Sequence, residues 1–124
     1  MSPIPFEERL ALVLDEAVRI LKPRGAWTKG GLAYDEDHRP VITSSPNATC
    51  WCALGALDRA QYNLMPKFGQ EYTWGLAISV TKILEDSLGN TALEMWNDKS
   101  SRRKKHVIDL FTRAAKDIRE EIAR

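Results

Sequence analysis

The chain has 124 residues and a mass of 14.0 kDa, with 44% hydrophobic and 28% charged residues. This length suits one domain with a hydrophobic core and is too short for a two-domain enzyme with a separate lid. The composition excludes disordered, collagen-like and disulfide-scaffold proteins. Because 18 basic and 17 acidic side chains leave a net charge of +1, the overall charge gives no indication of a polyanionic partner.

The sequence also indicates a compartment. No stretch approaches the roughly 18 apolar residues that a membrane span needs. The first part of the chain contains acidic residues, whereas a signal peptide has a cationic end followed by an uncharged apolar segment. We therefore expect a cytoplasmic protein with no membrane partner. Its two cysteines, Cys50 and Cys52, are two positions apart, and on a helix this offset points their side chains in nearly opposite directions, so a disulfide between them would be strained and free thiols are expected.

The first predicted element is an amphipathic helix that ends near Leu21. Apolar residues recur at steps of three and four between positions 10 and 21, and most of the charged residues lie outside this stripe. Pro5 suits the first turn, where its missing N–H is no loss. Lys22-Pro23 and Gly25 are typical of a helix end.

The segment from Gly25 to Asn47 lacks a helical period and is punctuated by glycines and prolines. Such long connections are uncommon in compact domains and are often functional. Two short strands, 32–34 and 40–43, are compatible with a hairpin across the turn 35–39.

Two further helices are predicted. Ser45-Pro46 is typical of a helix start, and the second helix then runs to about Leu64, before Pro66. The third covers about 71–88 and is stopped by Gly89-Asn90. Its apolar stripe consists of Trp74, Ala77, Ile78, Leu84 and Leu88.

A short helical turn with a capping box at 91–94 comes next. Asn97-Asp98 is predicted to cap the last helix, with Ser100 and Ser101 as competing caps. That helix, led by Val107, keeps its apolar period to the C-terminus. The sequence thus predicts a mainly α fold in a single domain, 1–124. We expect a compact bundle of about four helices with one long loop, which is compatible with a short β-hairpin.

The segment around the two cysteines is unusual because Gly55 lies within a predicted helix, at a cost of about 1 kcal/mol relative to alanine. Close packing explains it, with Cys52 acting as a small buried residue. The alternative is a nucleophilic cysteine, Cys50 or Cys52, with His38 or His106 as its base, in a small cysteine-dependent hydrolase. No known nucleophile signature surrounds either cysteine.

A metal site is not expected. Structural zinc sites pair their cysteines within one turn and place two histidines close together in the sequence, and this chain does neither. The sequence contains no cofactor motif, so we expect no cofactor.

The most basic stretch is the run 99–105. It contains five positive charges and no acidic residue, and such a run can contact phosphates next to the start of a helix. Its basic residues are Lys99, Arg102, Arg103, Lys104 and Lys105. Cations at a helix N-terminus are slightly unfavourable, so the run does not serve to stabilise the helix that follows. A solvated surface is the simpler interpretation, and contact with nucleic acid is the functional one.

Several motifs together resemble a known family. They are Trp27-x-x-Gly30, the segment Cys52-Ala53-Leu54-Gly55-Ala56-Leu57, the triplet Trp96-Asn97-Asp98, and a helix that carries Val107, Phe111 and Ala114. This combination resembles a domain of unknown function found in small uncharacterised bacterial and bacteriophage proteins. The resemblance spans about Ala26 to Ala115. It departs from the family pattern after Asn-Asp, where the family has arginine followed by threonine and this chain has the hydroxyl residue first, as Ser101-Arg102. It implies no activity, ligand or catalytic residue.

We therefore expect a cytoplasmic, non-enzymatic interaction module, related to phages or mobile elements. A protein partner is favoured, and nucleic acid is the second candidate through the run 99–105. The acidic loop with Asp35, Asp37 and His38 is the other candidate binding surface. The cysteine hydrolase remains the alternative function, and the sequence leaves the oligomeric state open.

Overall fold

The computed structural model describes residues 4–123. Its helices are α1 (Phe6–Leu21), α2 (Ala53–Phe68), α3 (Leu76–Ser87), α4 (Leu93–Asp98) and α5 (Lys104–Ile122). A 3₁₀ turn, η1 (Gln70–Tyr72), precedes α3, and two short strands, β1 (Ala33–Tyr34) and β2 (Cys50–Trp51), pair in antiparallel fashion. The predicted mainly helical fold is confirmed.

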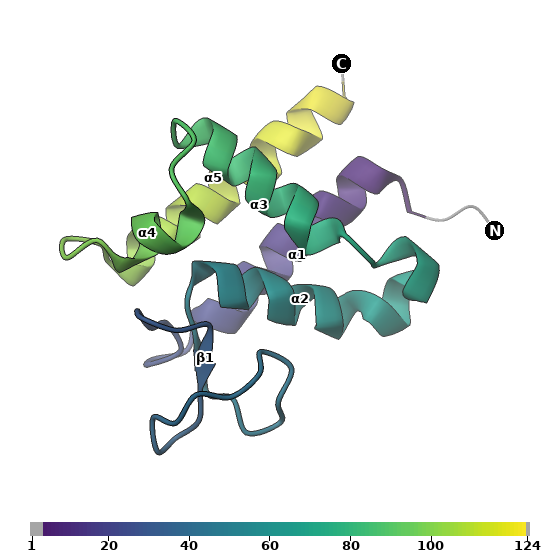
Figure 1. The fold of residues 1–124 in the computed structure, drawn as a ribbon. Helices are drawn as coiled ribbons and strands as arrows, with labels where there is room; N and C mark the ends of the chain where they lie inside the picture. Colours follow the sequence, from purple (N-terminus) through teal and green to yellow (C-terminus); the bar gives the residue numbers. More distant parts are fainter. Residues whose placement is uncertain (1–3, 124) are drawn as a thin grey trace.

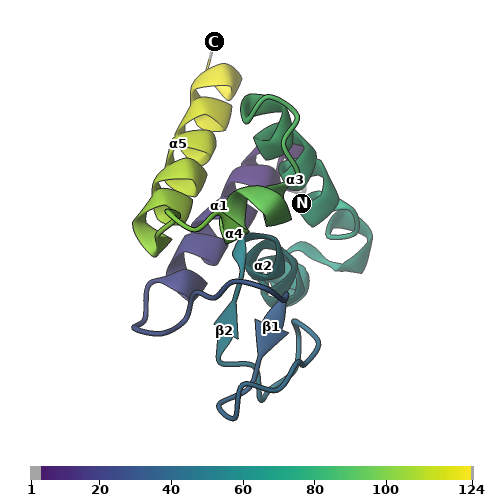
Figure 2. The same cartoon turned by 60° about the vertical axis from the view of Figure 1, so that its left-hand side comes forward.

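The helix α1 is the centre of the bundle. It packs along α5 and also contacts α2 and α3, and the β-strands lie beyond one end of this group, next to α2 (Figures 1 and 2). The predicted stripe on α1 is fully buried at Val13, Leu14 and Leu21, and it meets the α5 stripe at Val107 and Phe111. The two most regular apolar patterns in the sequence therefore form the core together. None of the helices within 4–123 is long and apolar enough to cross a membrane.

The β-structure differs from the predicted hairpin. The first strand lies where expected, but its partner is Cys50–Trp51 and not 40–43. Pro40 makes a single bridge to Tyr34, and Val41 N–H donates to Ala33 O (3.1 Å). Proline has no N–H with which to continue a ladder, so the chain turns away after this bridge and returns to the sheet ten residues later.

The second helix starts later and ends later than predicted. Ser45-Pro46 begins a turn and not the helix, because Cys50 and Trp51 are extended in β2 and Cys52 is the N-cap of α2. The helix continues through Pro66 and ends at Phe68. Its C-cap is Gly69, whose φ of +87° favours glycine. Trp51 is held in β2 by the backbone of the preceding loop, since its N–H donates to Ala26 O (2.8 Å).

The third helix is shorter and rotated relative to the predicted stripe. Its N-cap is Gly75, at a φ of +82°, and the buried residues of the helix are Leu76, Ala77, Val80 and Leu84. Two residues assigned to the buried stripe are exposed instead, Trp74 at 63% and Ile78 at 78%. Trp74 lies in the turn before the helix, and Ile78 points away from the core face.

The prediction that Asn97-Asp98 caps the last helix is wrong, because both residues belong to α4. The N-cap of α5 is Arg103, whose backbone N–H donates to His106 Nδ1 (2.9 Å). The capping box predicted for Thr91 to Glu94 is also absent, since Ala92 is the N-cap of α4. The first N–H of α4, on Leu93, donates instead to Glu85 Oε2 of α3 (2.7 Å).

Candidate functional site

Asn97 is a fully buried polar residue at the junction of three segments. Its Oδ1 accepts hydrogen bonds from Trp27 Nε1 (2.8 Å) and from the backbone N–H of Ala53 (2.9 Å), and its Nδ2 donates to Thr28 O (3.1 Å). One side chain therefore joins the loop after α1, the first residue of α2 and the end of α4. With its donors and acceptors paired inside the protein, Asn97 is a structural residue and not a catalytic one.

The segment after β2 is packed against a backbone carbonyl. A Cβ on Gly55 would lie 2.0 Å from Leu32 O, so only glycine fits at this position. Cys52 is buried, and its Sγ accepts a hydrogen bond from the Gly55 N–H (3.4 Å). Both cysteines are free thiols. The motif that stood out in the sequence thus serves close packing and helix capping.

The nucleophile–base pairs considered from the sequence do not form in this structure. Burial raises the pKa of the Cys52 thiol, which favours the unreactive protonated form. His38 stacks on the Tyr34 ring (4.2 Å between centroids), and His106 accepts from the backbone of Arg103. Within residues 4–123, no hydrogen bond joins either imidazole to Cys50 or Cys52.

The acidic loop forms a tight turn. Asp35 Oδ1 accepts from the backbone N–H groups of Asp37 and Arg39 (2.9 Å each), so its carboxylate is occupied in shaping the turn. The other residues at the tip, Asp37 and His38, are exposed, and His38 adopts a φ of +59°. The described residues include no group of three or more His, Cys, Asp and Glu side chains that could hold a metal ion.

The basic run predicted as a binding surface divides into two groups. Lys104 Nζ donates to the carbonyl oxygens of Lys22 (3.0 Å) and Pro23 (2.9 Å), and Arg102 Nε donates to Trp96 O (2.8 Å). These two cations therefore hold the fold together. The side chains of Lys99, Arg103 and Lys105 are exposed, and the structure gives them no hydrogen bond or ion pair within 4–123.

A second segment brings further cations to the same place. Lys29 Nζ donates to Lys99 O (2.7 Å) and Ser100 O (3.3 Å), while Lys104 reaches Lys22 and Pro23. The loop after α1 and the start of α5, about seventy to eighty residues apart in sequence, are thus in direct contact. The same loop carries two more exposed basic side chains: Lys22, which belongs to the predicted helix end, and Arg24, for which the sequence suggested no role.

We call the exposed cations of this surface whose side chains make no hydrogen bond or ion pair within residues 4–123 the basic cluster. Its members are Lys22, Arg24, Lys99, Arg103 and Lys105. The segments 22–31 and 98–106 together contain eight of the 18 Lys and Arg residues but only one of the 17 acids, Asp98. That carboxylate already accepts hydrogen bonds from Gly30 N (3.1 Å) and Asn97 Nδ2 (3.0 Å). The near-neutral chain therefore concentrates positive charge at one end.

An aromatic ring lies within this surface. The Arg102 guanidinium stacks over Trp96, 3.9 Å from the ring centroid, and is held there by its bond to Trp96 O. Cation–π contact and hydrogen bond together fix the plane of the guanidinium.

Residues 5–117 match a family of unknown function, DUF6197. No curated protein and no solved structure shows significant similarity to this chain. The match covers nearly the whole chain, and it includes both segments that form the basic cluster. The protein is therefore a member of DUF6197, a family of unknown function.

Proposed function

We propose that this protein is a non-enzymatic binding module that binds nucleic acid through the basic cluster. The observation that carries the proposal is the convergence of five exposed, unpaired cations from two segments that meet only in the folded chain. Like charges gathered at one place repel one another and destabilise the fold, and the cations at the start of α5 also oppose the helix dipole. A polyanion removes both penalties, because its phosphates neutralise the cluster.

The shape of the cluster favours phosphate contact without reading of bases. It is built from two loops and the first turn of a helix, and it presents no helix face that would enter a groove. The peptide N–H groups at the start of α5 add favourable partial charge for a phosphate. The proposal is therefore sequence-independent binding, in which the guanidinium groups of Arg24 and Arg103 and the ammonium groups of the lysines contact the backbone.

The test uses fluorescence anisotropy with a labelled DNA duplex and a labelled DNA single strand at low salt. The triple variant Arg24→Ala, Arg103→Ala and Lys105→Ala should bind at least about tenfold more weakly than the wild type. The matched control is Arg39→Ala, Lys67→Ala and Arg113→Ala, which removes three exposed cations outside the cluster and changes the net charge equally. This control should lose less than about twofold.

Two results would contradict the proposal. The first is equal weakening by both triple variants, which would show that net charge and not the cluster is responsible. The second is binding to phosphatidylserine vesicles with no binding to either DNA, which would assign the cluster to a membrane surface. Thermal unfolding of both variants confirms that they fold.

A further inference from the structure

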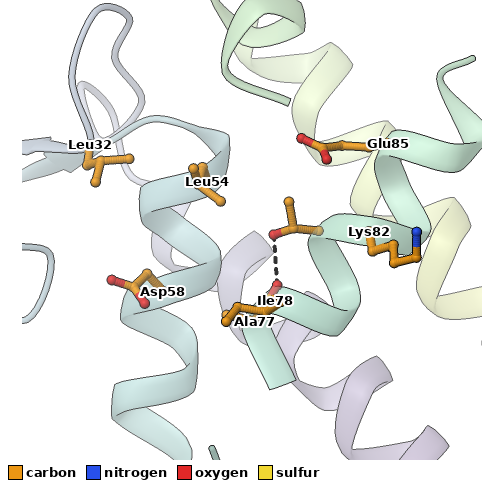
Figure 3. A pocket seen from close by; sticks show the side chains of 8 residues that line it. Leu32, Leu54, Asp58, Ala77, Ile78, Lys82 and Glu85 are labelled. Atoms are coloured by element: carbon orange, nitrogen blue, oxygen red, sulfur yellow. Dashed lines mark hydrogen bonds between the residues drawn. The ribbon is translucent and has the colours of Figure 1, made fainter. Parts of the chain in front are cut away.

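A hollow between α2 and α3 lies apart from the basic cluster. It has a volume of about 490 Å³, and its walls are mostly apolar. Figure 3 shows Leu32 and Leu54 on one side and Ala77 and Ile78 on the other, with Lys82 and Glu85 further along α3. A smaller hollow of about 420 Å³, lined in part by Ile42, adjoins it, since both share Leu32 and Asp58.

The rims of the two adjoining hollows carry protruding apolar side chains. Ile78 is 78% exposed and Ile42 is 73% exposed, and Leu32 between the two hollows is 42% exposed. A contiguous exposed apolar surface of this kind typically marks a contact site. Because one face of this chain has both a protruding apolar side chain and an apolar hollow, it can fit against an identical face related by a two-fold axis.

The charges of the rim decide what kind of partner fits. Lys82 is exposed and makes no ion pair within 4–123, whereas two carboxylates, Asp58 and Glu85, line the same hollow. One oxygen of each carboxylate accepts a hydrogen bond from within the chain. Asp58 accepts from Thr43 Oγ1 (2.6 Å), and Glu85 accepts from the Leu93 N–H. Because the cation and the two carboxylates lie around the same hollow, a second copy turned by a two-fold axis can set its cation against these carboxylates and its carboxylates against this cation.

We propose that this face is the interface of a homodimer, in which Ile78 of each copy enters the hollow of the other and Lys82 of each faces a carboxylate of the other. Such an interface is isologous, since the same patch serves on both copies. The proposal does not depend on nucleic-acid binding, because it uses no residue of the basic cluster.

Sedimentation equilibrium from about 10 µM to about 1 mM tests the proposal directly. The wild type should pass from monomer to dimer as its concentration rises. Ile78→Asp should weaken dimerisation at least about tenfold, because it removes the apolar side chain that enters the hollow and requires a hydrated carboxylate to be buried against mostly apolar walls. Lys82→Glu should weaken it about threefold to tenfold, because all facing charges become acidic.

The matched control is Met95→Asp, an equally charged change at a side chain that is 72% exposed on α4 and does not line the hollow. Its dimer dissociation constant should stay within about twofold of the wild type. A wild type that remains monomeric at the highest concentration would overturn the proposal. A dimer that is equally stable with Ile78→Asp would also overturn it, because the interface would then lie elsewhere.

Discussion

The indole N–H of Trp27 donates a hydrogen bond to Asn97 Oδ1 (2.8 Å), and this bond joins residues that are 70 positions apart in the sequence. The same oxygen accepts the N–H of Ala53, the first residue of α2. Asn97 thus fixes the loop that carries two members of the basic cluster relative to the segment that carries the other three.

Replacing Asn97 with alanine should destabilise the protein by about 3 kcal/mol. The change leaves two buried donors, Trp27 Nε1 and the Ala53 N–H, without an acceptor, and each such group costs about 1–3 kcal/mol. Urea unfolding followed by circular dichroism measures the loss. The exposed Asn47 is the control, since Asn47→Ala should change stability by less than about 0.5 kcal/mol. A loss below about 1 kcal/mol for Asn97→Ala would contradict the structural role.

Gly55→Ala should also destabilise the protein, although alanine is the better helix former by about 1 kcal/mol. The new Cβ would lie 2.0 Å from Leu32 O, a backbone atom that cannot move without displacing the loop before β1. We expect a net loss of about 2 kcal/mol or more. Gly31→Ala is the comparison, because its nearest obstacle is the end of the Tyr34 side chain, which can rotate away. Equal effects of the two substitutions in urea unfolding would refute the explanation.

The cysteines should be unreactive in the folded protein. Cys50 and Cys52 are only 8% and 4% exposed, so a reagent in solution reaches neither sulfur readily. Burial also raises the pKa of the Cys52 thiol, which favours its unreactive protonated form. A thiol-reactive dye such as Ellman's reagent should label neither cysteine within the time that it labels both in denaturant. Fast labelling of one thiol in the native state would support the hydrolase alternative.

Stability should fall in acid partly through Glu16. Its hydrogen bond from Arg19 Nε (2.7 Å), together with one from Asn63 (2.9 Å), holds the pKa of Glu16 below its ordinary value. A lowered pKa in the folded state stabilises the protein above the unfolded pKa of about 4.3, and this contribution is lost as the pH falls through the folded value. Glu16→Gln should therefore lose less stability than the wild type between about pH 5 and pH 2 in urea titrations. Parallel curves for the two proteins would show that Glu16 does not contribute.

The fold could be predicted from the sequence where the residues that specify an element lie within that element. The apolar periods of α1 and α5 predicted both helices and their buried faces, because each helix presents one continuous stripe to the other. The apolar period did not predict the buried face of the third helix, because the turn at Gly75 changes which face is buried. The strand pairing of Ala33 with Trp51 depends on the path of the intervening loop, which no local pattern encodes.

The candidate site could be predicted only in part, for the same reason. The run 99–105 is visible in the sequence, but the structure uses Arg102 and Lys104 to hold backbone carbonyls. Lys22 was part of the predicted helix end and Arg24 had no predicted role, and only the contact between Lys104 and the Lys22 carbonyl places this loop beside the run. Asn97 was assigned to a cap because its partners at Trp27 and Ala53 are far away in the sequence.

The most direct measurement of the central claim is the salt dependence of DNA binding. If the five cations of the basic cluster contact phosphates, the logarithm of the duplex association constant should fall against the logarithm of salt concentration with a slope of about −3 to −4.5. Removing Arg24, Arg103 and Lys105 should reduce the steepness of that slope to about −2 or less. A slope shallower than about −1 for the wild type, or no binding at about 50 mM salt, would contradict the assignment of this surface to nucleic acid.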